Sequence, residues 1–176
     1  MRVVKVGGSL FDLPDLATRL QTWLETNNDQ RNLLLAGGGK FVDCVREAQT
    51  VHQFDDVAAH WISIETMSST SRLLHALLPD SMLTDNLETA ISGDWPVVVW
   101  QPLAWLAGRE DLPQGWGFTS DSIAACLAVE TQAAELVLLK SCDSDDAGDD
   151  FVDQGFEQIA SAVPSCKFVN FREWSV

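Results

Sequence analysis

Val3-Val4-Lys5-Val6-Gly7-Gly8-Ser9 and Leu33-Leu34-Leu35-Ala36-Gly37-Gly38-Gly39 share one pattern, in which a short apolar run leads into consecutive glycines. Such apolar runs are typical of buried strands. Glycine adopts positive φ at little cost and lets the main chain approach a ligand closely, so the turn after each strand can aim backbone N–H groups at an anion. The two stretches together predict a phosphate-binding edge on a sheet.

Neither glycine stretch matches a common nucleotide-binding signature. The two stretches contain neither G-x-x-x-x-G-K-[ST] nor G-x-G-x-x-G, which disfavours a P-loop and a dinucleotide-binding fold. Either turn alone could be a tight connection between a strand and a helix. The pair favours an anion site, and the candidate phosphate-binding residues are Gly7, Gly8, Ser9, Gly37, Gly38, Gly39 and Lys40.

The remaining sequence alternates apolar strands with amphipathic helices, which predicts an α/β fold. We expect strands at residues 2–6, 32–35, 97–100, 135–139 and 167–170. Asp12 should cap a helix that ends at Asn27, and a long helix over residues 57–78 should kink or break in its serine- and threonine-rich middle. Further helices should follow Gly39 and occupy 121–129 and 153–162. This order predicts a three-layer αβα sandwich with a mainly parallel central sheet, built as a single domain over residues 1–176.

Composition narrows the function classes. The formal charge is -15, from 26 acidic and 11 basic residues, which argues against nucleic acid and anionic membranes as partners. A phosphorylated ligand stays possible, because distant charges are screened while groups in contact with the ligand are not. The start MRVVKVGGSL is unlike a signal peptide, and we expect a cytoplasmic protein. The four cysteines and three histidines show no metal-binding or disulfide spacing.

Two polar positions could carry chemistry. Lys5 lies on a valine-rich strand, so its ammonium must reach the open end of the strand or be buried at a cost. It could point at the same anion as the glycine turns, or its stem could pack while its head stays in solvent. Thr119 or Ser120 can cap a helix whose first turn holds Asp121. Asp121 could serve the helix terminus alone, or pair with Lys5 and hold it in place.

Four collinear motifs resemble the amino acid kinase family, which includes uridylate and acetylglutamate kinases. They are Lys5-Val6-Gly7-Gly8-Ser9, Gly37-Gly38-Gly39, Thr119-Ser120-Asp121-Ser122-Ile123-Ala124 and Glu135-Leu136-Val137-Leu138-Leu139. The resemblance implies that Lys5 stabilises the transferred phosphoryl group. It also implies that the glycine turns bind donor and acceptor anions, and that Asp121 orients lysines.

The segment after residue 139 departs from this family pattern. Relatives usually continue into a nucleotide-binding loop and hairpin that often supply a second lysine, whereas this chain reads Lys140-Ser141-Cys142-Asp143. We therefore expect a shortened nucleotide-binding segment. Lys140 is the candidate second cation, and Lys40 could touch an acceptor phosphate, although either could be a solvated surface residue.

Two further features could take part in binding. Trp116 could stack on a flat acceptor or anchor the core. The acidic run Asp143, Asp145, Asp146, Asp149 and Asp150 could gather Mg²⁺ or form a solvated loop, and Mg²⁺ could instead be held by the phosphates of the nucleotide.

The leading hypothesis is an ATP- and Mg²⁺-dependent kinase of a small, already phosphorylated acceptor. The short chain and residues 116–124 look most like the small kinases of methanofuran biosynthesis, which phosphorylate an aminomethylfuran methyl phosphate. Two alternatives stay open: a binding protein of the same fold without catalysis, and a kinase that makes an acyl phosphate from a carboxylate. The long helix could also support a homo-oligomer.

Overall fold

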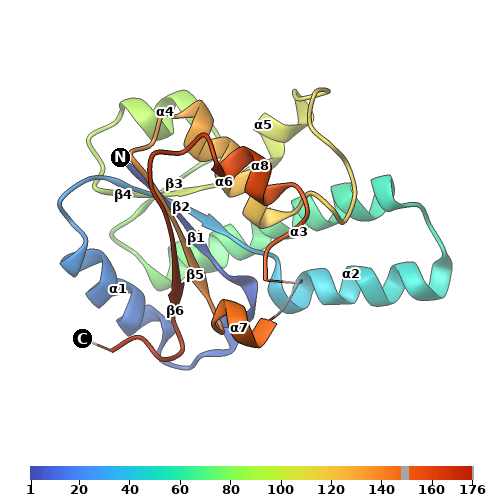
Figure 1. Ribbon diagram of the computed structural model, residues 1–176, viewed down its shortest axis with the longest axis horizontal. Coiled ribbons are helices and arrows are strands. Elements are labelled where there is room, and N and C mark those ends of the chain that lie inside the picture. Colours follow the sequence, from blue (N-terminus) through green and yellow to red (C-terminus); the bar gives the residue numbers. More distant parts are fainter. Residues whose placement is uncertain (148–150, 176) are drawn as a thin grey trace.

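A six-stranded parallel sheet forms the centre of the molecule in this computed structural model, which describes residues 1–147 and 151–175 (Figure 1). The strand order is β3-β4-β2-β1-β5-β6. The strands are β1 (Arg2–Val6), β2 (Asn32–Ala36), β3 (Met82–Thr84), β4 (Val97–Trp100), β5 (Glu135–Lys140) and β6 (Cys166–Asn170). All strands therefore end at the same edge of the sheet.

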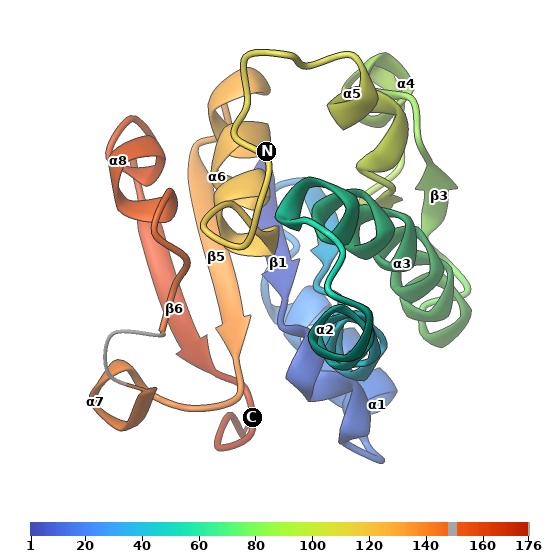
Figure 2. The ribbon, with the colours of Figure 1, turned by 90° about the vertical axis from the view of Figure 1, so that its right-hand side faces the viewer.

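Helices connect these strands. They are α1 (Leu16–Thr26), α2 (Gly39–His52), α3 (Asp56–Leu77), α4 (Leu87–Ser92), α5 (Leu103–Ala107), α6 (Ser120–Glu130), α7 (Ser144–Ala147) and α8 (Phe156–Ala160), with a 3-10 helix, η1, at Gly8–Asp12. Figure 2 shows α3, α6 and α8 side by side across one face of the sheet. No helix in the described parts of the chain is long and apolar enough to cross a membrane.

The strand side chains alternate between two hydrophobic layers, as the pleat of a sheet requires. Val3 and Leu33 belong to the layer under α3, α6 and α8. Val4 and Leu34 belong to the opposite layer, which contains α1, Leu10 of η1 and Phe171. The predicted three-layer αβα sandwich with a parallel sheet is confirmed.

Strand β1 lies in the middle of this sheet. It pairs with β2 on one side and with β5 on the other, and Lys5 is in register with Leu35 and Leu138. The first glycine turn follows β1 and the second follows β2, so the two turns are neighbours at the carboxyl edge. In an open parallel sheet, ligands bind outside this edge.

Several local predictions were wrong. Helix α1 begins at Leu16 after Asp15, and Asp12 belongs to η1 instead of capping the helix. Helix α3 runs without a break, and the hydroxyls of Thr66 and Thr70 bond to carbonyls of their own helix. Helix α8 is shorter than predicted, and the short elements β3, α4 and α5 were not predicted.

Candidate active site

The two glycine turns touch each other. A side-chain carbon added at Gly8 would lie 2.0 Å from the backbone nitrogen of Gly39, and one added at Gly39 would lie 2.3 Å from the carbonyl oxygen of Gly8. Gly39 also has φ of +54°, a conformation that glycine adopts without strain. Only glycine allows this approach, and it brings the N-terminus of α2 beside η1. The first amides of a helix have no partner within the helix, so those of α2 face the junction as donors.

Gly7 and Gly37 have a different role from the one predicted. The N–H of Gly7 donates to the carbonyl oxygen of Leu139 at 2.8 Å, and the N–H of Gly37 donates to that of Val6 at 2.9 Å. Both amides therefore extend the hydrogen bonding of the sheet. They do not point toward a ligand, and the donors available for an anion come from the residues that follow.

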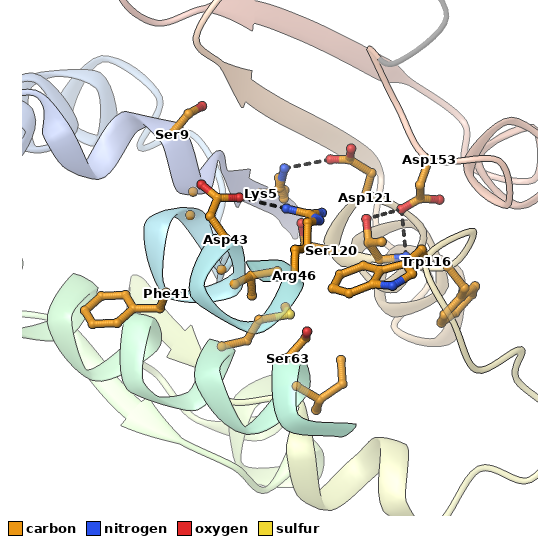
Figure 3. Close-up of a pocket in the computed structure, with 18 of the residues that line it drawn as sticks. Lys5, Ser9, Phe41, Asp43, Arg46, Ser63, Trp116, Ser120, Asp121 and Asp153 are labelled. Atoms are coloured by element: carbon orange, nitrogen blue, oxygen red, sulfur yellow. Dashed lines mark hydrogen bonds and ion pairs between the residues drawn. The ribbon is translucent and has the colours of Figure 1, made fainter. Parts of the chain in front are cut away.

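Asp121 lies between two lysines. Lys5 Nζ is 2.8 Å from Asp121 Oδ1, and Lys140 Nζ is 2.7 Å from Asp121 Oδ2. Figure 3 shows Lys5 and Asp121 pointing toward one another. The Lys5 contact is an ion pair between two side chains that are each less than one-tenth exposed. Lys140 Nζ also donates to the carbonyl oxygen of Phe151 at 2.5 Å.

Burial and charge act in opposite directions on these groups. Burial favours a raised pKa for Asp121, but the positive charges of Lys5 and Lys140 outweigh it and hold the pKa of Asp121 below its ordinary value. The pKa of Lys140 is lowered by burial and by the nearby charge of Lys5, while Asp121 and Asp153 oppose that shift. The site therefore holds two closely spaced cations that share one carboxylate.

A second aspartate holds the start of α6. Thr119 is at the N-cap position, yet its side chain makes no capping bond within the helix. Asp153 Oδ2 instead accepts hydrogen bonds from the N–H of Thr119 at 2.9 Å, its Oγ1 at 2.7 Å and the N–H of Ser122 at 3.1 Å. Asp153 Oδ1 accepts from Ser122 Oγ. The sequence pattern assigned Asp153 to a helix start, and no local signal indicated this contact.

These groups face one cavity of about 1000 Å³ at the carboxyl edge of the sheet. Its lining includes Lys5, Gly8, Ser9, Gly38, Gly39, Lys40, Trp116, Thr119, Ser120, Asp121 and Lys140. All the predicted site residues except Gly7 and Gly37 therefore line one space. Ser9 Oγ donates to Ser141 Oγ at 2.9 Å and joins the first turn to the segment after β5.

The far wall of the cavity combines the predicted Trp116 with Arg46 and His60. Arg46 of α2 stacks on the indole of Trp116 with its guanidinium carbon 4.6 Å from the ring centre, and Trp116 Nε1 donates to Gln49. Trp116 is thus held from two sides. His60, one of the three histidines without metal-binding spacing in the sequence, is buried and lines the cavity together with Ile64.

The carboxylates near the lysines do not form a metal site. Both oxygens of Asp121 pair with lysines, and both oxygens of Asp153 accept hydrogen bonds. Within residues 1–147 and 151–175, no group of three His, Cys, Asp or Glu is placed to hold a metal ion. In the predicted acidic run, Asp143 accepts a hydrogen bond from Asn170, while Asp149 and Asp150 lie outside the described residues.

Comparison with known proteins agrees with this geometry. A sequence model described as the amino acid kinase family matches residues 1–146. The [5-(aminomethyl)furan-3-yl]methyl phosphate kinase of Methanocaldococcus jannaschii is 22% identical over 148 residues, which are 81% of this chain and 67% of that protein.

Solved structures share the fold. The uridylate kinase of Archaeoglobus fulgidus superposes with a TM-score of 0.61 at 20% identity, over 81% of this chain and 64% of that one. The UMP kinase of Bacillus anthracis superposes with a TM-score of 0.69 at 14% identity, over 98% of this chain and 87% of that one. This chain therefore spans about two thirds of the first protein and most of the second.

Proposed function

We propose that this chain, which belongs to the amino acid kinase family, transfers the γ-phosphoryl group of ATP to a small acceptor that already carries a phosphate. The observation that carries the proposal is the Lys5–Asp121–Lys140 arrangement, facing two contacting glycine turns in one cavity. Two fixed cations beside aligned backbone donors are what a phosphoryl group needs as it passes between two anions.

In this proposal the protein positions its substrates and forms no covalent intermediate. The bond between the γ-phosphorus and the oxygen bridging it to ADP breaks, and a bond forms from phosphorus to an acceptor oxygen in line with it. Lys5 and Lys140 neutralise the negative charge on the moving group. The amides at Gly8, Gly39 and Lys40 hold phosphate oxygens.

The state of the carboxylates favours an anionic acceptor. Asp121 and Asp153 are engaged by lysines and by backbone and hydroxyl donors, so neither is placed to remove a proton from an alcohol. A phosphate monoester needs no such base, because it is mostly deprotonated at neutral pH. The methyl phosphate kinase of M. jannaschii, by its name, acts on an acceptor of this class.

We further propose that Mg²⁺ enters bound to the phosphates of ATP, since the described side chains offer it no site of their own. The part of the chain that follows Lys140 would serve as the shortened nucleotide-binding segment of a single domain. A cytoplasmic location fits an ATP-dependent enzyme with four free cysteines.

The test is an acceptor screen that measures ADP release with MgATP. The panel should contain [5-(aminomethyl)furan-3-yl]methyl phosphate, UMP and a set of carboxylates, each with and without the protein. We expect turnover with a phosphate monoester and a diphosphate product visible by ³¹P NMR.

Two results would contradict the proposal. Turnover with a carboxylate alone would show an acyl phosphate kinase. Binding of MgATP and acceptor by calorimetry, without ADP release from any pair, would indicate a binding protein. Titrations need both ligands present, because one substrate can complete the site for the other.

A further inference from the structure

Residues 151–155 form a strap that connects the two halves of the charged site. The carbonyl oxygen of Phe151 accepts from Lys140, and its ring lies 5.1 Å from the same ammonium. Asp153 accepts four hydrogen bonds from Thr119 and Ser122. The N–H of Gly155 donates to the carbonyl oxygen of Gly117 at 3.0 Å. One short segment therefore fixes both Lys140 and the loop before α6.

Asp153 accepts hydrogen bonds from the start of α6 on both sides of Asp121. Thr119 precedes Asp121 by two residues and Ser122 follows it directly, and both are bonded to the same carboxylate. The backbone that carries Asp121 is thereby held while its carboxylate bridges the lysines. A local cap from Thr119 or Ser120 would not couple this turn to the segment beyond Lys140.

We propose that Asp153 is a positioning residue for phosphoryl transfer, which orients Asp121 and keeps Lys140 at the reacting phosphates. This inference rests on the proposed kinase function and deepens it. Among the described residues, the charges that act on Lys140 are those of Lys5, Asp121 and Asp153. The negative charge of Asp153 opposes the lowering of the Lys140 pKa by burial and by Lys5. Loss of Asp153 would both loosen Asp121 and favour the neutral form of Lys140.

The closing experiment compares Asp153→Asn with wild type by two independent readouts. The first is NMR titration of isotope-labelled lysine side chains, which is practical because the chain has four lysines: Lys5, Lys40, Lys140 and Lys167. We expect the pKa of Lys140 to fall in the variant. The second is kinetics, where we expect kcat to fall on the order of 10- to 100-fold with a smaller change in KM. The decline of kcat on the alkaline side of its pH profile should also move to lower pH.

Two further variants complete the design. Asp111→Asn is the matched control, because Asp111 also accepts two hydrogen bonds, from Arg109, but lies outside the cavity. Ser122→Ala removes one donor and keeps the carboxylate, so kcat should fall by less than in Asp153→Asn, while the pKa of Lys140 should stay close to that of wild type. This variant tests the positioning role even where Asp153→Asn fails to fold.

A Lys140 titration in Asp153→Asn that is unchanged from wild type overturns the proposal, and so does a normal kcat in both variants when they only melt earlier. If wild-type protein turns over no acceptor, the proposed kinase function fails. The titration still decides whether Asp153 controls Lys140.

Discussion

Lys5 is a buried cation that lines the cavity. Its side chain is 7% exposed and lies beside a single carboxylate. In the proposed reaction this ammonium neutralises negative charge on the transferred group. Its contribution should therefore be larger in the transition state than in binding.

Lys5→Met should reduce kcat by about 100-fold or more, because removal of one preorganised charge-stabilising group typically costs that much. Circular dichroism should show an intact fold. Lys167→Met is the matched control, since Lys167 pairs with Glu135 and its side chain is 64% exposed. A near-normal rate in Lys5→Met would remove the proposed role.

Asp121 should make stability depend on pH. Its folded pKa lies below the ordinary value of 3.8, so the unfolded chain binds the proton more readily. The stabilisation is fully present above the unfolded pKa and is lost as pH falls through the folded pKa. Asp121→Asn should lower the free energy of unfolding by about 3 kcal/mol at pH 7, since it leaves two lysines without their shared partner.

Urea denaturation of wild type and Asp121→Asn at pH 7 and at pH 3 checks this sign. The difference in free energy of unfolding between the two proteins should be smaller at pH 3 than at pH 7. An equal difference at both pH values would mean that the carboxylate is not stabilised by the lysines.

At the scale of elements, the contact between the two glycine turns sets the geometry of the cavity. Gly8→Ala places a methyl group 2.0 Å from the nitrogen of Gly39, so η1 and α2 must move apart. We expect the affinity for MgATP, measured by calorimetry, to fall at least about tenfold, because the donors no longer converge. Gly108→Ala is the control, since the nearest atom to its added carbon lies at 3.7 Å. Equal affinity in both variants would contradict the convergence.

The strands could be predicted from the sequence more easily than their surroundings. Residues 97–100 of β4 and 136–139 of β5 are continuous apolar runs that only a buried strand explains simply. Strand β3 has three half-buried residues and gives no such signal. The serines and threonines of α3 were misread because their hydroxyls can bond within the helix as well as disrupt it.

The candidate site was only partly predictable from the sequence. Gly8, Gly39 and Lys5 are residue types that are unusual in their local pattern, so they stand out in the sequence. Asp153 looks like an ordinary helix-start residue, and its partners Thr119 and Ser122 lie more than thirty positions away. A helix cap supplied by a residue far away in the sequence produces no periodic pattern that a reader of the sequence could detect. Gly7 and Gly37 show the opposite case, because a glycine pattern does not tell which amides are already used by the sheet.

For the whole molecule, residues 171–175 close the layer opposite α6. Phe171 is fully buried and stacks on Trp174, while Arg19 donates to the carbonyl oxygens of Phe171, Arg172 and Trp174. Arg172 in turn donates to the carbonyl oxygen of Ser9 in the first glycine turn. The tail therefore contacts the first glycine turn, whose Ser9 lines the cavity.

Phe171→Ala should lower the free energy of unfolding by about 3 kcal/mol or more, as burial of a large aromatic predicts. Phe168→Ala should cost less than half as much, because Phe168 is 45% exposed. Urea denaturation of both variants provides the comparison. Equal losses would show that the tail does not complete the core.

Self-association through the long helix stays a prediction. That helix is α3, and its outer side exposes Ile62 and Leu73. Analytical ultracentrifugation of wild type and of Ile62→Glu tests it. We expect a dimer that the charged variant dissociates, whereas a monomeric wild type would contradict the prediction.

The central place of β1 also governs when the site can exist during synthesis. Both neighbours of β1 must be present, yet β2 is made early and β5 about a hundred residues later. A nascent chain that has emerged only through α6 holds both glycine turns and Asp121, but it lacks Lys140 and the carboxylate that secures Thr119. Under the proposed function, nucleotide should therefore stabilise the growing polypeptide only after residue 153 has left the ribosome.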